Sequence, residues 1–559
     1  MSDQAAARLR EAFAALQLGQ PDRADRLLAG LLRKTPRHFD ALIALGAVRG
    51  QQGRFADAAT LFERAAKVRP DDADAHYNIG VAHAHLGSKE RALDCYRRAL
   101  RAEPRHLNAC NNLAAELLAL DRWSDALACV QQGLAQYPGD AQLLSKLGAA
   151  LQGIGRIDEA IQSFRQVVHI RPNDSFSHGN LGLALKAAGQ ADKAIRSLDR
   201  AVSLDPDLAS HHNHLALALS EDGRLDDAVA SLRRAIELDP GAAEFRENLG
   251  IALLLKGDLA EGWTQYEFRH HLQRFKSRRP AIDAPMWQGE ALTNKSILVY
   301  AEQGFGDTIQ FVRYLPLLAE RSASVTLALQ PRLIPLLSNS VAYANIIPAD
   351  QAGSHYDFQC ALMSLPHAFG TTLSSIPAPV PYLSADPARI ARWRERIGED
   401  GFKIGIAWQG SPTYAGDKGR SIPLREFAPL AAIPGVRLIS LQQGFGAEQV
   451  AAVDFNARIE TPDEHLDEAG AFVDTAAVVE NLDLIVTCDT SILHLAGALG
   501  RPLFVALCRA HDWRWLLDRE DSPWYPSARL FRQTGIGDWS DVLARIAAEV
   551  VRSRPATRP

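Results

Sequence analysis

The sequence of 559 residues predicts an α-helical solenoid in its first half and an α/β region of two Rossmann-like units in its second half. Two observations lead to this fold class. Up to about residue 274, proline and glycine recur at a constant interval of 34 residues. Beyond that point the interval is lost, and short apolar runs alternate with helical stretches. Such alternation is typical of parallel sheets that are covered on both faces.

The 34-residue interval is the period of tetratricopeptide repeats, each of which is a pair of antiparallel helices. Glycine turns the chain after the first helix, and proline cannot continue the second. We therefore expect eight repeats over residues 3–274, with Asp121 as the one break in the glycine series. The recurring residues are Pro36, Pro70, Pro104, Pro138, Pro172, Pro206 and Pro240, and Gly19, Gly53, Gly87, Gly155, Gly189, Gly223 and Gly257.

Where the helices of a repeat cross, a small residue such as Gly46 is expected to face a larger apolar one such as Phe62. Two positions before the small residue, polar side chains form a column. It consists of Asn78, Asn112, Asn180 and Asn248, interrupted by Lys146 and His214. Because amides donate to and accept from any peptide backbone, the column predicts a groove for an acceptor peptide. The alternative is that these asparagines only solvate an exposed face.

In the second half we expect a linker at 275–293, a first Rossmann-like unit at 294–385 and a second at 386–553. A proline-rich stretch, Ile376–Pro387, divides the two units. Parallel sheets of this kind bind ligands at the carboxyl ends of their strands. The strands are expected at Ile297–Ala301, Val325–Leu329, Phe358–Leu362, Ile404–Trp408, Val436–Leu441, Leu484–Cys488 and Leu503–Leu507.

The first strand-to-helix junction with candidate chemistry is Ala301–Pro316, which contains Gly304, Gly306 and Asp307. We expect Asp307 to open a helix at the carboxyl edge of the first sheet. Its carboxylate could take a proton from an acceptor hydroxyl. It could equally cap the helix by accepting hydrogen bonds from backbone N–H groups.

The second junction follows the strand that ends at Cys488. Here the start of a helix attracts anions, and two neighbouring hydroxyls suit a diphosphate. The candidate residues are Asp489, Thr490, Ser491 and, one turn later, His494, which could instead be a packed residue. Lys418 and Arg420, on a glycine-bearing loop, could clamp phosphates or form a solvated surface pair.

An aromatic cluster lies in the stretch His511–Pro526. Its large side chains could stack on a nucleotide base. We favour the alternative that they pack a crossover segment between the two units. The cluster consists of Trp513, Trp515, Trp524 and Tyr525.

Over about residues 294–535, these junction motifs resemble the heptosyltransferase-type glycosyltransferases. The resemblance implies the GT-B fold, with the acceptor on the N-terminal unit and a nucleotide-sugar donor on the C-terminal unit. It also implies inverting transfer without a metal ion or other cofactor. It makes Asp307 the general base, and its donor-side positions correspond to Lys418, Arg420, Thr490, Ser491 and His494, with Asp489 beside them.

The order of repeats and transferase, like the asparagine column, is similar to the O-linked N-acetylglucosamine transferases. The catalytic histidine motif of that family is not found, so UDP-N-acetylglucosamine is not assumed as the donor. Bacterial repeat-containing glycosyltransferases, some of which modify flagellin, also look similar. The first unit is short for the GT-B fold, and the repeats would supply the missing acceptor surface.

The charge, the cysteines and the apolar runs of the sequence argue against several classes of function. A net charge of −5 and a pI near 6.4 argue against a nucleic-acid binder. The six cysteines form no CxxC pair, which favours a reducing cytoplasm. No stretch has the pattern of a signal peptide or a membrane span. The expected partners are an acceptor protein, a nucleotide sugar and, through exposed repeat faces, a second copy of the chain.

The leading hypothesis is a cytoplasmic protein O-glycosyltransferase that modifies Ser or Thr of a protein held by the repeats. One alternative is a repeat scaffold or adaptor whose transferase half is degenerate. Another is a transferase that acts on lipid-linked glycans.

Overall fold

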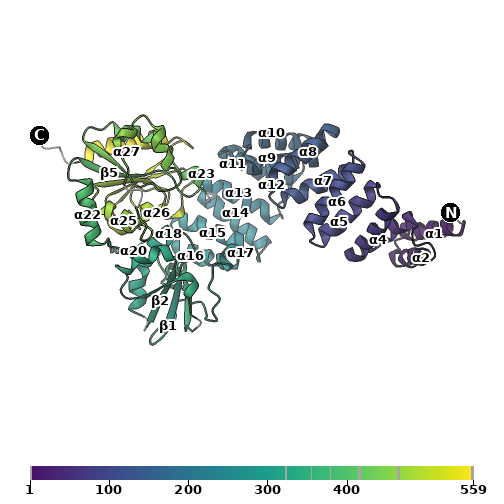
Figure 1. Cartoon of the computed structure of the whole chain (residues 1–559), viewed down its shortest axis with the longest axis horizontal. Helices are drawn as coiled ribbons and strands as arrows, with labels where there is room; N and C mark the ends of the chain where they lie inside the picture. The colour runs from purple at the N-terminus through teal and green to yellow at the C-terminus, as the bar shows by residue number, and fades with distance from the viewer. Residues whose placement is uncertain are drawn as a thin grey trace. The chain divides into compact units, whose positions relative to one another are not determined.

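The computed structural model describes residues 3–321, 324–353, 355–377, 379–412, 417–462 and 466–554 (Figure 1). The chain forms two compact bodies, residues 1–206 and 207–559, named here the N-terminal body and the C-terminal body. No helix of the described residues combines the length and the apolar character needed to cross a bilayer.

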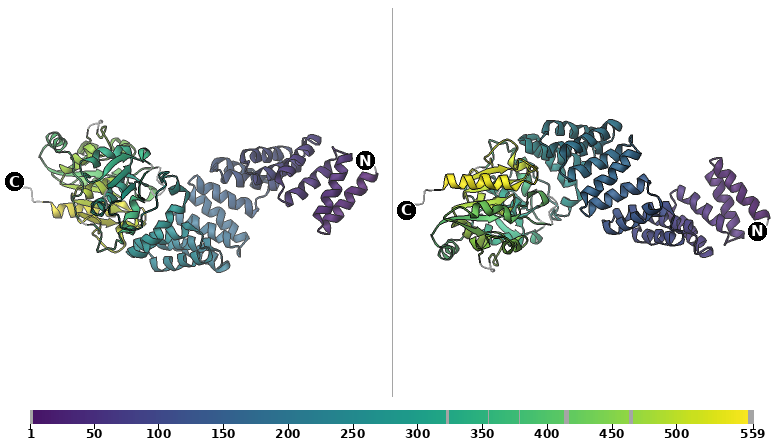
Figure 2. Two further views of the ribbon diagram at one scale, coloured as in Figure 1. Left: turned by 90° about the horizontal axis from the view of Figure 1, so that it is seen from below. Right: turned by 90° about the horizontal axis from the view of Figure 1, so that it is seen from above.

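The N-terminal body is a stack of antiparallel helix pairs, as the repeat period predicts (Figure 2). The chain turns at glycines with left-handed backbone, and Asp121 takes the same conformation at φ 55°. A Cβ atom on Gly46 would lie 2.5 Å from the Phe62 ring, which confirms the expected helix crossing. The helices are α1 (Asp3–Gln17), α2 (Pro21–Lys34), α3 (Phe39–Gln51), α4 (Phe55–Val68), α5 (Ala73–His85), α6 (Lys89–Ala102), α7 (Leu107–Leu118), α8 (Trp123–Gln136), α9 (Ala141–Gly153), α10 (Ile157–Ile170), α11 (Ser175–Ala187) and α12 (Ala191–Leu204).

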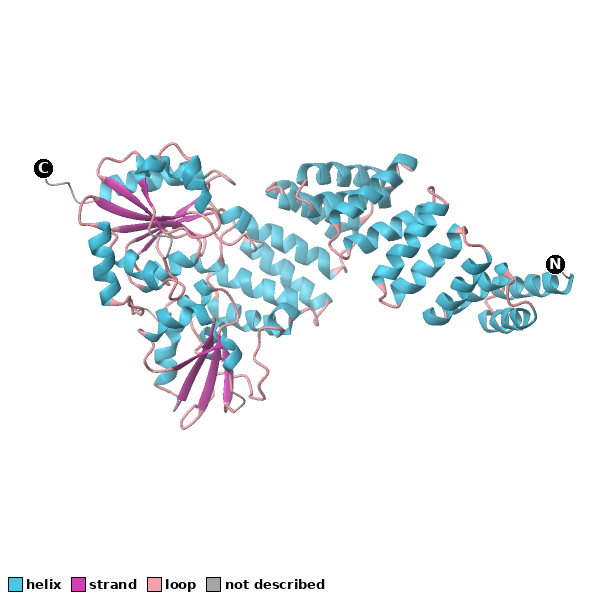
Figure 3. Cartoon of the chain, viewed as in Figure 1, coloured by secondary structure: helices cyan, strands magenta, loops and turns pink. Residues whose placement is uncertain are grey.

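The C-terminal body begins with two more helix pairs and a short helical turn, and then continues into two α/β lobes. We call residues 286–385 the first lobe and residues 386–553 the second lobe. Figure 3 shows one parallel sheet in each lobe. The helical part consists of α13 (Ala209–Glu221), α14 (Leu225–Leu238), α15 (Ala243–Lys256), α16 (Leu259–Tyr266), η1 (Glu267–His271) and α17 (Gln273–Lys276).

The first lobe has a four-stranded sheet in the order β3-β2-β1-β4, with every paired strand parallel. The order reverses between β1 and β4, which makes their carboxyl ends the topological switch point of the sheet. Its elements are β1 (Ser296–Tyr300), α18 (Phe305–Phe311), η2 (Val312–Tyr314), α19 (Leu315–Ala319), β2 (Ser324–Leu329), η3 (Pro331–Leu333), α20 (Ile334–Ser338), β3 (Asn345–Pro348), η4 (Ala349–Gln351), β4 (Phe358–Ala361), η5 (Leu362–Ser364) and α21 (Leu365–Ala368).

The second lobe has a six-stranded parallel sheet in the order β10-β9-β8-β5-β6-β7, which is the doubly wound order with its switch point between β5 and β8. Separate apolar clusters cover its two faces. Its elements are α22 (Pro387–Ile397), β5 (Phe402–Ala407), α23 (Asp417–Arg420), η6 (Leu424–Phe427), α24 (Ala428–Ala431), β6 (Val436–Ser440), η7 (Ala447–Ala452), η8 (Asn456–Arg458), β7 (Ile459–Glu460), α25 (Val473–Glu480), β8 (Leu484–Cys488), α26 (Ser491–Ala498), β9 (Leu503–Leu507), η9 (Trp513–Trp515), β10 (Ala528–Arg532) and α27 (Trp539–Ser553).

The α/β class and the parallel sheets agree with the sequence prediction, and seven strands lie within two residues of their expected bounds. Three strands, β3, β7 and β10, were not expected. Strands β3 and β7 are short edge strands, and β10 carries two arginines that obscure its apolar pattern. Part of the expected linker instead belongs to the first lobe, because Met286 bridges to Gln359 and Trp287 is buried.

A buried network of charges joins the last repeat to the first lobe. Arg269, in η1, is 0% exposed and donates to Glu302 at 2.6 Å, to Glu267 at 2.5 Å and to Ser364 at 2.8 Å. Burial of the Glu267 carboxylate raises its pKa, but Arg269 and His270 outweigh this effect and lower the pKa of Glu267 to about 2. Glu302 and Ser364 follow β1 and β4, so the repeat fills the switch point of the first sheet.

We predict that Arg269→Met lowers the free energy of unfolding of the C-terminal body by about 3–5 kcal/mol, because it removes this cation from the buried carboxylate of Glu302 and the partly buried carboxylate of Glu267. Chemical denaturation followed by tryptophan fluorescence measures this loss. The matched control is Arg233→Met, which removes an exposed ion pair with Glu261 and should change stability by about 0.5 kcal/mol or less. Equal effects of the two substitutions would contradict the role of Arg269.

Candidate functional site

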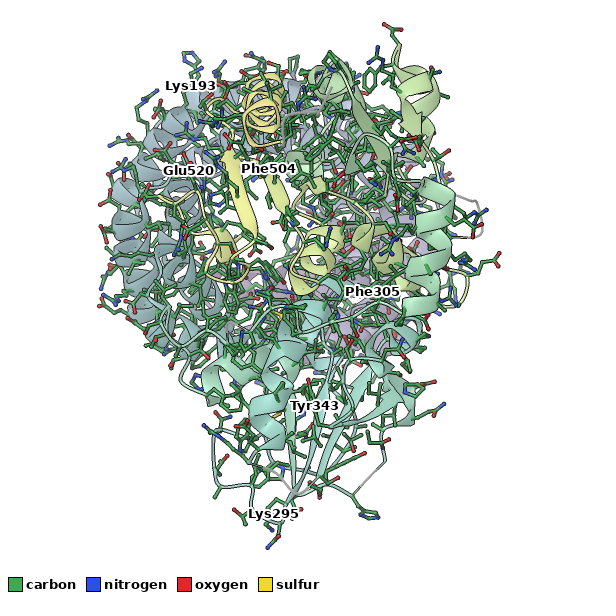
Figure 4. All side chains as sticks on the ribbon, turned by 90° about the vertical axis from the view of Figure 1, so that its left-hand side faces the viewer. Lys193, Lys295, Phe305, Tyr343, Phe504 and Glu520 are labelled. Atoms are coloured by element: carbon green, nitrogen blue, oxygen red, sulfur yellow. The ribbon has the colours of Figure 1, made fainter. Side chains whose placement is uncertain are left out.

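The two junctions singled out in the sequence come together at the boundary between the lobes. A Cβ atom on Gly306 would lie 2.7 Å from Cδ2 of His494 and 3.5 Å from Cα of Ser491. The start of α18 therefore lies directly against the start of α26. In Figure 4, Phe305 of α18 lies between the strand that carries Phe504 and the part of the first lobe marked by Lys295. Its ring also contacts that of Phe472 in the second lobe, with centroids 6.0 Å apart.

Asp307 is the third residue of α18, two residues later than expected, and it does cap the helix. Its Oδ2 atom accepts from the Gly304 N–H at 2.9 Å, and its Oδ1 atom accepts from Nη2 of Arg514 at 2.6 Å. Burial raises the pKa of Asp307, against the opposing effect of Arg514, and Asp512 raises it further. A raised pKa brings a carboxylate closer to the range of a useful general base. The catalytic role of Asp307 stays a prediction.

The start of α26 differs from that of α18, because no side chain caps it. Ser491 is half-buried, whereas Thr490 is 9% exposed and its hydroxyl lies 3.3 Å from that of Thr487. The Thr490 hydroxyl therefore has a partner inside the protein, and Ser491 is the more exposed of the two residues. Binding of a phosphate by Thr490 stays a prediction.

His494 is packed, which is the alternative left open by the sequence. It is 6% exposed, its Nδ1 atom lies 2.9 Å from the Tyr525 hydroxyl, and its ring stacks on that of Trp515. Burial lowers its pKa well below the usual value, and Arg514, Arg313 and Arg420 lower it further. The imidazole is therefore neutral at pH 7.

Asp489 lies at the switch point of the second sheet, directly after β8. Its Oδ2 atom accepts from Nε1 of Trp515 at 2.9 Å. Burial together with Asp512 raises the pKa of Asp489 to about 6, although Trp515, Arg514 and Arg420 oppose the rise.

Arg420 follows β5, the other strand at the switch point. Its Nε atom donates to Asp417 at 3.2 Å, and its charge acts on Asp489, Cys488 and His494. The structure thus places Arg420 at the same sheet edge as the α26 start. The side chain of Lys418 lies outside the described residues, and its predicted role stays a prediction.

The aromatic cluster packs the segment between the lobes, as favoured above. Trp513 lies edge-on against Trp263 of the last repeat, and Trp524 lies against Phe311 of α18. All four aromatic side chains are at most 5% exposed, so none is available to stack on a base.

The side chains of the asparagine column are half-buried, and some of them form hydrogen bonds between neighbouring repeats. In the N-terminal body, Asn112 donates to the Tyr77 hydroxyl at 3.3 Å, and Lys146 donates to Asn111 at 3.1 Å. In the C-terminal body, Asn248 donates to Asn213 at 2.9 Å. Lys146 and Asn180 also line a cavity of about 350 Å³. Asn78 and Asn180 are half-buried too, and peptide binding by the column stays a prediction.

Sequence reasoning missed Arg514, Gln310 and Arg313, which link the lobes. Arg313 donates to the Trp524 carbonyl at 2.7 Å and to the Tyr382 hydroxyl at 3.0 Å. All three side chains are at most 5% exposed. For Arg514 the available signal was its position between Trp513 and Trp515, since a cation buried among aromatic side chains needs a carboxylate partner.

Comparison with known proteins supports the repeat assignment. The tetratricopeptide repeat family model matches residues 44–106, 111–175, 180–243 and 215–266. The first half of the chain therefore consists of tetratricopeptide repeats, and repeat arrays of this type present extended binding surfaces. Protein FlbA of Caulobacter vibrioides is 29% identical over an alignment of 316 residues, which covers 53% of this chain and 52% of FlbA. The chain thus spans about half the length of this curated relative.

Several solved structures are similar to part of the chain. A tetratricopeptide repeat protein from Parabacteroides merdae is 16% identical, covers 44% of this chain and 98% of its own, and has a TM-score of 0.38. YrrB, described as a TPR protein with an unusual peptide-binding site, is 21% identical over 32% of this chain and 93% of its own, with a TM-score of 0.30.

We predict that Asp489→Asn stabilises the C-terminal body in a pH-dependent way. Because the pKa of Asp489 is raised from 3.8 to about 6, the folded wild type binds this proton more tightly than the unfolded chain does. The contribution of Asp489 to the stability of the wild type therefore falls as the pH rises between those two values. The asparagine keeps an acceptor for Trp515 but removes this pH dependence.

Thermal melting between pH 4 and pH 8 measures the effect. The melting temperature of the variant relative to wild type should rise up to about pH 6 and then stay constant. The control Asp454→Asn removes an aspartate charge at an exposed site. A difference for Asp489→Asn that does not change with pH would disprove the raised pKa.

Proposed function

We propose that the protein is a GT-B-type glycosyltransferase that moves a sugar from a nucleotide-sugar donor to a serine or threonine hydroxyl of a protein held by the repeats. One observation carries the proposal. Two strand-to-helix junctions far apart in the sequence meet at the carboxyl edges of two parallel sheets, with Gly306 against Ser491 and His494. Doubly wound sheets bind ligands at this edge.

The donor would lie on the second lobe. Its diphosphate would accept hydrogen bonds from the uncapped start of α26 and from Ser491, and it would pair with Arg420 and Lys418. Groups that are placed before the reaction stabilise the charge that builds on the leaving diphosphate, because they need little reorganisation. Neutral His494 beside this site adds no charge of its own.

The acceptor would approach from the first lobe. Its hydroxyl oxygen forms a bond to the anomeric carbon while the bond from that carbon to the diphosphate oxygen breaks, and the electron pair leaves with the diphosphate. Asp307 takes the hydroxyl proton. Because Gly306 lies against Ser491 and His494, the lobes would separate to admit the sugar and close again before transfer, when Asp307 pairs with Arg514 once more. Closure around substrate is common in enzymes with two lobes.

We predict that Asp307→Asn lowers transfer by about 10²–10⁴-fold, the usual contribution of a general base, while donor binding is nearly unchanged. Asparagine can still accept from the Gly304 N–H, so the helix cap is retained. Intact-mass spectrometry of acceptor proteins, flagellin among them, would detect the added sugar. Calorimetry with a panel of sugar nucleotides would measure donor binding.

The matched control is Asp350→Asn, at an exposed position in η4, which should leave transfer unchanged. Full activity of Asp307→Asn would remove Asp307 from the mechanism. If the wild-type chain binds no sugar nucleotide of the panel, the scaffold alternative holds, which the repeat assignment already supports.

Transfer to a lipid-linked glycan is distinguished by truncation. A cut at residue 274 would remove Arg269 and expose the first-lobe switch point, so the cut belongs at residue 206, between the two bodies. If the acceptor is a protein held by the repeats, residues 207–559 should bind donor as the full chain does but lose most transfer. Undiminished transfer to a small glycan by the truncated chain would favour the lipid-linked alternative.

A further inference from the structure

Arg514 is the buried cation at the lobe boundary, and none of the sequence motifs identified it. It lies in η9 of the second lobe, is 5% exposed, and reaches across to Asp307 of the first lobe. The two residues are 207 positions apart in the chain. Their ion pair therefore exists only when the lobes are folded against each other.

All three nitrogen atoms of the Arg514 guanidinium donate hydrogen bonds. Nη2 donates to Oδ1 of Asp307 at 2.6 Å, Nη1 to Oδ1 of Asp512 at 2.8 Å and Nε to Oε1 of Gln310 at 2.5 Å. Its Cζ atom lies 4.3 Å from the centre of the Trp513 ring. A planar group that makes this many contacts is fixed in one orientation. Its hydrogen bond to Asp307 therefore fixes the orientation of that carboxylate as well.

Asp307 is held from both ends as a result. The Gly304 N–H fixes Oδ2 at 2.9 Å, and Arg514 fixes Oδ1. Each carboxylate oxygen has a second lone pair, so the carboxylate can still take the proton of the substrate hydroxyl. Without Arg514, only the helix cap would orient this side chain.

Several charged groups act on Asp307. The cation Arg514 opposes protonation, whereas the neighbouring acids Asp512 and Glu302 favour it. Asp512 and Arg514 also act on Asp489, whose pKa the acid raises and the cation lowers. Neutral His494 and Tyr266 adjoin the cluster without carrying charge at pH 7.

We propose that Arg514 is the positioning residue of the reaction, which holds the Asp307 carboxylate charged and oriented at the lobe boundary, with Asp512 as the group that balances its charge. This inference rests on the proposed role of Asp307 as the base. Arg514 acts through Asp307 and not on the sugar nucleotide.

The test uses the full-length chain labelled with carbon-13 at the aspartate carboxyl groups. The Asp307 signal is identified as the one missing from Asp307→Asn. In Arg514→Gln its titration midpoint should rise, because a nearby positive charge is lost. In Asp512→Asn the midpoint should fall, because a nearby negative charge is lost. Arg514→Lys should lie between wild type and Arg514→Gln, because it keeps the charge without the planar fork.

The second readout is the pH profile of transfer, with the donor and acceptor that the wild type uses. Arg514→Gln should lose on the order of tenfold more turnover at pH 6 than at pH 8, relative to wild type. A role limited to holding the lobes together would lower turnover equally at both pH values and would overturn the proposal. So would a midpoint that does not move, or that moves in the same direction in Arg514→Gln and Asp512→Asn.

Should Arg514→Gln fail to fold, the partly exposed Asp512 still decides the question, because Asp512→Asn must lower the midpoint and improve transfer at acidic pH. Failure of the proposed function is recognised separately, since the wild type itself would then yield no product. Product formed by the wild type, with an unchanged pH profile in Asp512→Asn, would refute this inference alone.

Discussion

The buried guanidinium of Arg269 constrains the rest of the C-terminal body. A fully buried cation is stable only with carboxylates in contact, and Glu302 and Glu267 supply them from opposite sides of the junction between repeat and lobe. One apolar core then runs from Leu225 of α14 through the first lobe into the second. Trp263 of the last repeat packs on Trp513, which fixes the segment that carries Arg514. The last repeats are thus structural parts of the α/β region.

This arrangement makes the switch points of the two sheets different. In a doubly wound sheet the switch point is the open crevice, yet in the first lobe Arg269, Glu302 and Ser364 occupy it. The equivalent point of the second lobe, between β5 and β8, is lined instead by Arg420, Asp489 and the uncapped start of α26. The two lobes are therefore not equivalent at the carboxyl ends of their strands.

At the lobe boundary, three carboxylates interact with one buried arginine. Arg514 pairs with Asp307 and Asp512, and its charge also acts on Asp489. Burial raises the pKa of Asp307 and of Asp489, while Arg514 limits both rises. Carboxylates with raised pKa values in one cluster are more common at functional sites than elsewhere.

The sequence by itself determined the repeats and the central strands. Turns at Gly19 and Asp121, and the fit of Gly46 against Phe62, depend on residues within one repeat, so a regular period reveals them. Buried strands such as β8 and β9 are continuous apolar runs and are recognised in the same way. It also placed Asp307, Arg420 and Ser491 at the carboxyl ends of strands.

Only the tertiary structure decided which of these residues meet. The pairing of Arg514 with Asp307, the burial of Thr490 and His494, and the insertion of Arg269 beside Glu302 leave no local pattern. The Arg514 pair joins the two lobes, the Arg269 pair joins the last repeat to the first lobe, and Thr490 and His494 find their partners within the second lobe. The two ion pairs form because a buried charge needs an opposite charge in contact, and the position of that charge is set by the assembled fold rather than by neighbours in the chain.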